Sequence, residues 1–405
     1  MRIEIVDTTL RDGQQSPLMF DAFKYRFSLE EKKLLVKGLI ELGVSCLEFF
    51  SPVVSKTEKE DFIEIKKYVK KITKKKILFM AHCRCHPDDI NEAIAVGFTG
   101  LHLYIGTSEE SRNSNHGKNL DEIIALVEPI LKNLRDKYPK LYLRFSGEDS
   151  FRTKLSDLFK VYDPIVKYVN TLGMPDTVGI ANPEIVAKRI KAMKKRYPNT
   201  DLECHFHNDC GLAIINALTA IKNGVKYVDT TIWGISERSG IPSVTSLLFN
   251  LFYINPELVE GYNLEVCYPL NVLLGSIMKM HVPWNEPVSL TNRTHTAGVH
   301  QKAVLKNEKV YEGHDLEKFG VTKGQILLGP LSGWNLIQYY LREVKNLDIT
   351  MEQAKEVTKK FKSGVSKIHK GFKAEKFLLE IVKDYNIPKI KVPKDINKKR
   401  VEILN

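Results

Sequence analysis

The segment Asp201-Leu-Glu-Cys-His205-Phe-His207-Asn-Asp209 places two histidines two residues apart at the end of a short apolar run. In a β-strand, residues i and i+2 point to the same face, so both imidazoles can reach one divalent cation. A second apolar run ends in an acid and an arginine, in Ile3-Glu-Ile-Val-Asp7-Thr-Thr-Leu-Arg11-Asp12-Gly13. If both runs are strands of one barrel, their ends meet. The expected result is a mixed oxygen and nitrogen metal site made of Asp12, His205 and His207.

Residues 3–232 alternate short apolar runs with longer amphipathic stretches, which predicts eight strands, each followed by a helix. The expected strands are Ile3–Asp7, Cys46–Phe50, Ile77–His82, Gly100–Ile105, Leu141–Ser146, Tyr168–Leu172, Leu202–His205 and Tyr227–Thr231. Expected helices include Leu29–Leu42, Leu120–Tyr138, Glu184–Arg196 and Leu212–Asn223. This order predicts a (β/α)8 TIM barrel followed by a mainly helical C-terminal region. An open doubly wound sheet is the alternative, but no glycine-rich phosphate motif follows the first strand.

The alternating rhythm changes after about residue 240. We expect the catalytic barrel to span residues 1–260 and an irregular linker or subdomain, rich in proline and glycine over 283–331, to span 261–335. Residues 336–405 are expected to form a helical, lysine-rich region.

Composition excludes several classes of protein. Of the net charge of +12, +8 lies in residues 351–405, which carry 15 Lys and Arg against 7 Asp and Glu. These lysines alternate with acids and lack an aromatic platform, so we expect a solvated surface and no nucleic-acid partner. No apolar run has the roughly 18–20 residues of a membrane helix, and we expect no cleavable leader before the first strand. Six scattered cysteines are typical of reduced core thiols, and a cytoplasmic protein is expected.

The donor set of Asp12, His205 and His207 leaves coordination positions open and suits Zn, Mn, Co or Mg with a bidentate substrate. An α-keto acid is such a ligand, and the metal would make its keto carbon electrophilic. Arg11 could stabilise an oxygen that develops negative charge, although a salt bridge at the barrel rim is the plainer interpretation. Either histidine could also be an ordinary hydrogen-bonded strand residue.

Two further polar positions follow apolar strands. Glu48 ends the run Cys46-Leu-Glu-Phe-Phe and needs a partner, for which substrate hydroxyls, Arg11 and Arg144 are candidates. Arg144, Ser146 and Glu148 share one strand face. The guanidinium of Arg144 and the hydroxyl of Ser146 could bind a second carboxylate, as expected for a dicarboxylic substrate. The alternative is an ion pair that fills the barrel.

Three motifs carry a family resemblance: Asp7-Thr-Thr-Leu-Arg-Asp-Gly13, Glu203-Cys-His-Phe-His-Asn-Asp209 and Thr294-His-Thr-Ala-Gly-Val-His300. They resemble the acyl-CoA-condensing metallolyase (DRE-TIM) family, which includes 2-isopropylmalate, citramalate and homocitrate synthases. The resemblance runs from residue 3 to about residue 365. Within the family, the stretches most similar to homocitrate synthases are Arg144-Phe-Ser-Gly-Glu-Asp-Ser-Phe-Arg152, Arg84-Cys-His86 and Leu331-Ser-Gly-Trp-Asn335.

The resemblance implies roles for individual residues. Asp12, His205 and His207 match metal ligands, Arg11 matches the arginine that polarises the keto oxygen, and Glu48 matches a catalytic carboxylate. The residues that match 2-oxo acid contacts are Arg144, Ser146 and Thr177, with His86 near the distal carboxylate.

The resemblance also implies a shared site. His300 and Tyr311 match a histidine and a tyrosine delivered by the neighbouring subunit, with His300, favoured over His295, as the base for the acetyl methyl group. A homodimer or a higher homo-oligomer is therefore expected.

The implied reaction is condensation of acetyl-CoA with 2-oxoglutarate to give homocitrate. The main alternative is a Re-type citrate synthase acting on oxaloacetate. An isopropylmalate or citramalate synthase, or a lyase similar to hydroxymethylglutaryl-CoA lyase, is less favoured. Lyases of that type use a cysteine-bearing glycine-rich loop, which this chain lacks. His102 stands where lysine-responsive homocitrate synthases usually carry an acid, which bears on both feedback and substrate length.

Overall fold

The computed structural model describes residues 2–365 and 373–390 in full and the backbone of residues 401–404. The chain divides into two compact units, Met1–Pro283 and Trp284–Asn405. The first unit extends beyond residue 260 because helix α11 (Cys267–Met278) packs on helix α2 (Leu29–Leu42). Gly38 of α2 allows this approach, since a Cβ there would lie 2.8 Å from Leu270 Cδ1.

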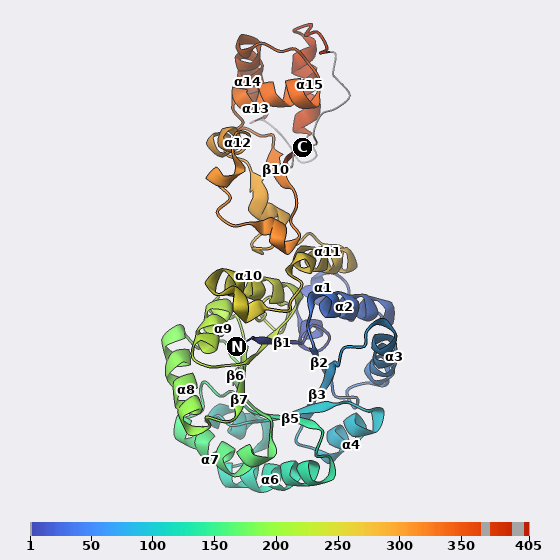
Figure 1. The fold of residues 1–405 in the computed structure, drawn as a ribbon, viewed down its shortest axis with the longest axis vertical. Coiled ribbons are helices and arrows are strands. Elements are labelled where there is room, and N and C mark those ends of the chain that lie inside the picture. The colour runs from blue at the N-terminus through green and yellow to red at the C-terminus, as the bar shows by residue number, and fades with distance from the viewer. Residues whose placement is uncertain (1, 366–372, 391–400, 405) are drawn as a thin grey trace. The chain divides into compact units, whose positions relative to one another are not determined.

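The first unit is a closed barrel of eight parallel strands that pair in chain order, with β1 also pairing with β8. The strands are β1 (Glu4–Asp7), β2 (Cys46–Phe50), β3 (Leu78–Arg84), β4 (Gly100–Gly106), β5 (Tyr142–Glu148), β6 (Thr171–Asp176), β7 (Asp201–Phe206) and β8 (Tyr227–Thr230). Figure 1 shows the helices as a ring around these strands. The predicted TIM barrel is therefore confirmed.

The sixth strand was predicted in the wrong place. Residues Val166–Tyr168 form a 3-10 turn that follows helix α7 (Leu155–Ile165), and β6 begins only at Thr171. The strand includes Gly173 and Pro175, which are weak strand formers, so its sequence does not resemble a strand. Gly173 is required by packing, because a Cβ there would meet Ser146 Oγ at 1.8 Å and Glu203 Oε2 at 2.7 Å.

The barrel helices carry recognisable start and stop signals. Ser28 and Glu31 form a capping box at the start of α2, and Gly43 ends this helix with a φ of 106°. The other principal helices are α3 (Lys56–Ile72), α4 (Pro87–Val96), α6 (Leu120–Lys137), α7 (Leu155–Ile165), α8 (Pro183–Arg196), α9 (Ala213–Lys222) and α10 (Val244–Ile254). Short helices α1 (Leu18–Asp21) and α5 (Glu109–Ser111) lie in loops after β1 and β4.

The barrel interior changes from apolar to charged along the strands. Val6, Cys46 and Met80 form a buried apolar cluster, against which Tyr142 and Tyr227 pack. Farther along the barrel strands, the buried side chains are charged or polar, including Glu48, His102, Arg144, Glu203 and Asp229. The polar groups therefore gather toward the C-terminal ends of the strands, where TIM-barrel active sites lie.

The second unit contains a parallel sheet in the order β11-β10-β9. Its strands are β9 (Thr294–His295), β10 (Gly324–Leu327) and β11 (Val401–Leu404), and its helices are α12 (Gly298–Val304), α13 (Trp334–Tyr339), α14 (Met351–Val365) and α15 (Ala374–Lys383). Its apolar core includes Ile326, Tyr340, Phe361 and Leu378. This agrees with the predicted helical region, although part of the lysine-rich tail lies outside the described residues.

Among the described residues, no helix is both long and apolar enough to cross a membrane. All six cysteines are free, and each except Cys210 is buried. The prediction of core thiols is therefore confirmed for five of the six positions.

Candidate active site

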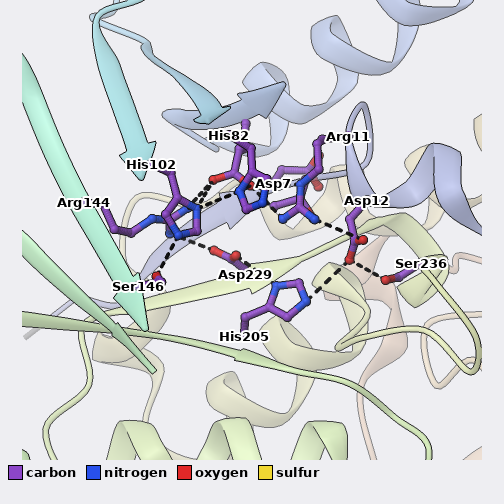
Figure 2. A network of polar contacts seen from close by, with 12 residues as sticks. Asp7, Arg11, Asp12, His82, His102, Arg144, Ser146, His205, Asp229 and Ser236 are labelled. Carbon is purple, nitrogen blue, oxygen red and sulfur yellow. Dashed lines mark hydrogen bonds and ion pairs between the residues drawn. The ribbon is translucent and has the colours of Figure 1, made fainter. Parts of the chain in front are cut away.

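The strand ends of the first unit surround a cavity of about 250 Å³. Loops after β1, β7 and β8 complete its wall, and Figure 2 shows how the polar side chains converge there. The lining residues are Arg11, Asp12, Gln15, His82, His102, Tyr104, Ser146, Glu148, Pro175, Thr177, Glu203, His205, His207, Glu237 and Arg238.

Asp12, His205 and His207 lie together, as the sequence predicts. Their nearest donor atoms all lie within 4.8 Å of one another, and all three residues are buried. His205 lies beside Asp12 because β7 and the loop after β1 meet at the same end of the barrel (Figure 2). Nε2 of His205 is 3.5 Å from Asp12 Oδ2.

Asp229 on β8 sets the orientation and tautomer of His205. Its Oδ2 lies 3.0 Å from His205 Nδ1. Burial raises the pKa of Asp229, but Arg144 and His205 together outweigh it and the pKa is lowered, so the carboxylate accepts and Nδ1 donates. The lone pair of His205 Nε2 then faces the cavity.

His207 supplies the second nitrogen. Its Nε2 lies 3.2 Å from Nε2 of His205. Burial, and then the adjacent His205, lower the pKa of His207 to about 3, so the imidazole is neutral and able to bind a cation. Two nitrogen atoms and a carboxylate oxygen facing one another at this separation are suited to a shared metal ion.

Asp12 has two further partners. Arg11 Nη1 lies 3.1 Å from Asp12 Oδ1, and the Ser236 hydroxyl donates to Asp12 Oδ2. Burial raises the pKa of Asp12, but Arg11 and His205 outweigh it, and the pKa is lowered. Asp12 is thus held as a carboxylate, and the other side of the same guanidinium bonds to Glu48.

Glu48 is the centre of a second buried network. Its Oε1 accepts from Arg11 Nε at 3.1 Å and Nη2 at 2.7 Å, and its Oε2 accepts from Arg144 Nη2. Burial raises the pKa of Glu48, but Arg144 and Arg11 outweigh it and hold the pKa well below its usual range. Of the partners considered from sequence, both arginines contact Glu48.

His102 joins this network to the cavity. Its Nδ1 lies 2.9 Å from Glu48 Oε2, and its Nε2 lies 2.7 Å from Ser146 Oγ. Burial, and then Arg144, lower the pKa of His102 to about 4, which leaves a neutral ring. Nδ1 of His82 lies 3.1 Å from Nδ1 of His102.

Arg144 lies beneath the cavity and is not among the residues that line it. Besides Glu48, its Nη1 bonds to Asp229 Oδ1 at 3.0 Å and lies 3.6 Å from Glu203 Oε2. The guanidinium that we expected to meet a substrate carboxylate is thus surrounded by buried carboxyl groups.

The buried charges fit a bound cation. Four carboxyl groups, on Asp12, Glu48, Glu203 and Asp229, share the two guanidinium groups of Arg11 and Arg144. Burial, and then the charge of Asp229, raise the pKa of Glu203 well above its usual range, and neither Glu203 oxygen has a hydrogen-bond partner. An excess of buried carboxyl groups beside three converging donor atoms is the arrangement that a divalent cation would neutralise.

The structure brings some of the other predicted substrate residues to the cavity. Ser146, Thr177 and Glu148 line it, and Thr177 Oγ1 also accepts from Asp149 N at 2.9 Å. His86 does not line it, because β3 ends at Arg84 and His86 caps the following helix. The histidine of β3 that lines the cavity is His82, whose ring stacks on Tyr104 with centroids 4.2 Å apart.

His82 and Asp229 are two site residues to which sequence reasoning assigned no role. The signal for Asp229 was an acid in the middle of an apolar strand, Tyr227-Val-Asp-Thr230. The signal for His82 was the two-residue alternation with Met80, whose side chain faces the barrel interior.

His300 and Tyr311 belong to the second unit. Their rings stack with centroids 3.8 Å apart and planes inclined by 22°. The other histidine of this motif, His295, is buried, and its Nε2 lies 3.4 Å from Glu312 Oε1. His300 is exposed, so of the two imidazoles it is the more accessible to a substrate within this unit.

Comparison with known proteins extends these observations. A family model described as HMGL-like matches residues 2–266, and a second, described as homocitrate synthase post-HMGL domain-like, matches residues 288–368. The cytosolic homocitrate synthase isozyme of Saccharomyces cerevisiae is 36% identical over 362 residues, which cover 89% of this chain and 81% of that protein. A mitochondrial homocitrate synthase of the same yeast is also 36% identical, over 89% of this chain and 79% of that protein.

Other relatives have different names. The 2-isopropylmalate synthase 1 of Caldanaerobacter subterraneus subsp. tengcongensis is 30% identical over 89% of this chain and 90% of its own. Among solved structures, hydroxymethylglutaryl-CoA lyase from Pseudomonas aeruginosa superimposes with a TM-score of 0.57 at 16% identity, over 69% of this chain and 94% of that one, which shows a shared fold. From the family matches and the identity to the yeast enzymes, we conclude that this chain belongs to the HMGL-like family, as a homocitrate synthase-like acyl-CoA-condensing enzyme.

Proposed function

We propose that this enzyme condenses acetyl-CoA with 2-oxoglutarate to give homocitrate and free CoA. One observation carries the proposal: the donors Asp12, His205 and His207 line the same cavity as hydrogen-bonding groups suited to a dicarboxylate. Those groups are Arg11, His82, Ser146 and Thr177. The names of the yeast relatives support the choice of 2-oxo acid.

The proposed reaction is a Claisen-type condensation followed by hydrolysis. A base removes a proton from the acetyl methyl group, and the resulting carbon attacks the keto carbon of the 2-oxo acid. A carbon–carbon bond forms, and the keto oxygen takes up a proton. Water then cleaves the thioester to give a carboxylate and the CoA thiol.

A divalent cation (Mn, Mg, Zn or Co) held by Asp12, His205 and His207 would supply Lewis-acid polarisation of the keto group when bound. Arg11 is fixed by Glu48 on one side and Asp12 on the other, so its charge is available where the keto oxygen becomes negative. We assign Glu48 the task of holding Arg11 and Arg144 in place.

We assign the 2-oxo acid to the polar wall of the cavity. Ser146 and Thr177 offer hydroxyl groups, and His82 offers an imidazole where we first expected His86. Glu148 lines the same wall, and burial, followed by the charge of Asp149, raises the pKa of its carboxyl group. Arg144 lies beneath the cavity, and it would position Glu48 and His102 through its contacts with them.

We propose His300 as the base, with Tyr311 stacked on it as the orienting group. An imidazole suits proton transfer near neutral pH. In the arrangement implied by the family resemblance, both residues come from the neighbouring subunit, so the enzyme would be a homodimer or a larger homo-oligomer.

A second candidate is oxaloacetate as the 2-oxo acid, which would give citrate. His102 favours it, because this buried ring lines the cavity and already bonds to Ser146. A ring at this position leaves less room for the distal end of a substrate. The difference of one methylene is worth about 1–3 kcal/mol in a pocket.

The test is CoA release from acetyl-CoA in the presence of Mn²⁺ or Mg²⁺, with 2-oxoglutarate, oxaloacetate, pyruvate and 2-oxoisovalerate offered in parallel. The highest kcat/KM with 2-oxoglutarate would support homocitrate synthesis. Preference for oxaloacetate would establish the second candidate. Preference for pyruvate or 2-oxoisovalerate, or no release with any of the four acids, would overturn the proposal.

A further inference from the structure

Arg293 is a buried arginine of the second unit that no step of the proposed reaction uses. Its side chain is 4% exposed and lies just before β9. All three of its nitrogen atoms donate. Nε donates to Glu312 Oε2 at 2.8 Å, Nη2 to Glu308 Oε2 at 3.1 Å, and Nη1 to the Val321 carbonyl oxygen at 2.9 Å. The planar guanidinium therefore fixes three separate points of the chain relative to one another.

Two of these points lie on either side of Tyr311. Glu308 precedes Tyr311 by three residues, and Glu312 follows it directly. Residues Glu308–Val310 form a single 3-10 turn. The backbone N–H groups of Tyr311 and Glu312 both donate to the Glu308 carbonyl oxygen, at 3.2 Å and 3.1 Å. The segment is thus closed by its own backbone and attached at both ends to one guanidinium.

Apolar packing does not hold this segment in place. Val310 is 55% exposed and Tyr311 is 39% exposed. The side chain of Glu312 is almost buried, and its Oε1 lies 3.4 Å from Nε2 of the buried His295. A buried ion-pair network contributes little net stability compared with apolar residues of similar volume. The geometry that this network imposes on the segment is therefore the better explanation for it.

The ring that stacks on Tyr311 is anchored independently. His300 lies on α12, and the next residue, Gln301, is fully buried. Gln301 Nε2 donates to the carbonyl oxygens of Leu327 and His295, at 2.8 Å and 3.4 Å. These bonds attach α12 to strands β10 and β9. Because α12 is fixed to the sheet, the stacking of the two rings depends on where Tyr311 is held.

We propose that Arg293 is a positioning residue for the catalytic imidazole. It holds Glu308 and Glu312, and these two carboxylates fix Tyr311 between them. Tyr311 in turn fixes the plane of the His300 ring, with centroids 3.8 Å apart and planes inclined by 22°. A base that is oriented in advance does not have to be ordered during proton transfer. This inference rests on the proposed function, since it takes His300 as the base.

The test removes one carboxylate at a time from the full chain. Glu308→Ala and Glu312→Ala should each lower kcat about tenfold to hundredfold, because a catalytic group misplaced by about 1 Å can cost about 100-fold. KM for the 2-oxo acid should not change, since the groups that line the cavity for this substrate belong to the first unit. Glu308→Gln should recover most of the kcat, because its amide oxygen can still accept from Nη2 of Arg293.

Glu317→Ala is the matched control. Glu317 Oε1 lies 3.7 Å from Arg293 Nη1, so this change also removes a negative charge beside the guanidinium. Glu317 lies outside the segment 308–312 that contains Tyr311. The kcat of this variant should therefore equal that of the wild type.

A second measurement needs no turnover. The NMR resonance of the His300 Cε1 proton is identified by its absence in His300→Gln. Glu308→Ala and Glu312→Ala should both shift this resonance, because the ring current of a stacked Tyr311 no longer acts on it. Glu317→Ala should leave the resonance in place.

The outcomes separate this inference from the proposed function. If Glu308→Ala and Glu312→Ala keep the wild-type kcat and the wild-type His300 resonance, Arg293 does not position the base, even if the wild type makes homocitrate. If both variants shift the resonance but the wild type turns over no 2-oxo acid, the positioning of the ring stands and the proposed reaction fails. Equal losses of kcat in Glu317→Ala, or no recovery in Glu308→Gln, would assign the effect to lost charge and overturn the inference.

Discussion

His205 and Asp229, on neighbouring strands of the barrel, share a hydrogen bond of 3.0 Å between Nδ1 and Oδ2. The carboxylate of Asp229 also bonds to Arg144 at 3.0 Å, so a single side chain connects the candidate metal ligand to the buried arginine. Neither Asp229 nor this connection follows from the spacing of the two histidines. The hydrogen bond to Asp229 determines that Nε2 of His205 is the nitrogen free to bind a metal ion.

Asp229→Asn should weaken metal binding. The amide can still accept from His205 Nδ1, but without the negative charge that makes the ring a better ligand. Losses of outer-shell partners cost about 10–100-fold in metal affinity. Titration with Mn²⁺ or Zn²⁺ measures the Kd. Asp163→Asn, which removes a surface ion pair with Arg196, is the control and should leave the Kd unchanged.

His207→Ala should abolish stabilisation by metal. A ligand present at 100 times its Kd raises the free energy of unfolding by about 2.7 kcal/mol if it binds only the folded state. Wild-type protein should therefore melt at a higher temperature with Mn²⁺ or Zn²⁺ than with a chelator. The variant should melt at the same temperature in both. A metal-dependent shift that survives in His207→Ala would place the binding site elsewhere.

His102→Asn should change the choice of substrate. The smaller side chain removes a ring from the cavity wall and releases Ser146 Oγ. If His102 limits substrate length, the ratio of kcat/KM for 2-oxoglutarate to that for oxaloacetate should rise about tenfold or more. His281→Asn, which changes an exposed histidine, is the control. An unaltered ratio would show that another residue sets the length.

His102 should also contribute to acid sensitivity. Burial and Arg144 lower its pKa from 6.5 to about 4 in the folded chain. Between these pH values the unfolded chain binds a proton that the folded chain excludes, so the free energy of unfolding falls as the pH drops from 6.5 to about 4. The full shift corresponds to a loss on the order of 3 kcal/mol.

Urea unfolding of wild type and His102→Asn at several pH values measures this loss. His207 also has a lowered pKa and is common to both proteins. His82 contacts His102, so the difference in pH dependence reports on His102 together with this neighbour. Parallel curves for the two proteins would contradict the assignment.

His300→Ala should abolish turnover while leaving metal affinity intact, because His300 lies in the second unit and the metal donors lie in the first. If neighbouring subunits share the site, mixing His300→Ala with His205→Ala subunits should restore part of the activity. Purified heterodimers that remain inactive would count against a shared site. A fully active His300→Ala enzyme would remove this histidine from the mechanism.

The sequence predicts most of the barrel, since seven of the expected strands overlap the observed ones closely. The position of strand β6 was not predicted correctly because Gly173 and Pro175 have low strand propensity. Packing in the barrel interior, rather than strand propensity, requires the glycine. The metal donors were predictable because two-residue alternation on β7 orients both histidines. The choice between His82 and His86 depends on where β3 ends, and strand boundaries are the least predictable part of a sequence.

The electrostatic partners were the hardest to predict. Glu48 needed a partner, and substrate hydroxyls, Arg11 and Arg144 were all candidates from the sequence; only the closed barrel shows that it bonds to both arginines. In the same way, the expected role of Arg144 at a substrate carboxylate came from its strand face. The Arg144 side chain does point into the barrel, as predicted. How deep it lies along the barrel axis depends on contacts among strands that are far apart in sequence.

The excess of buried carboxyl groups around Arg11 and Arg144 has a consequence for the abundance of this protein in the cell. A chain folded without its cation keeps like charges close together in a medium that screens them poorly, so metal uptake and folding reinforce each other. Newly made chains that find no metal would spend more time open to proteases. Metal starvation should then reduce the abundance of the enzyme, so that little inactive protein accumulates for later loading.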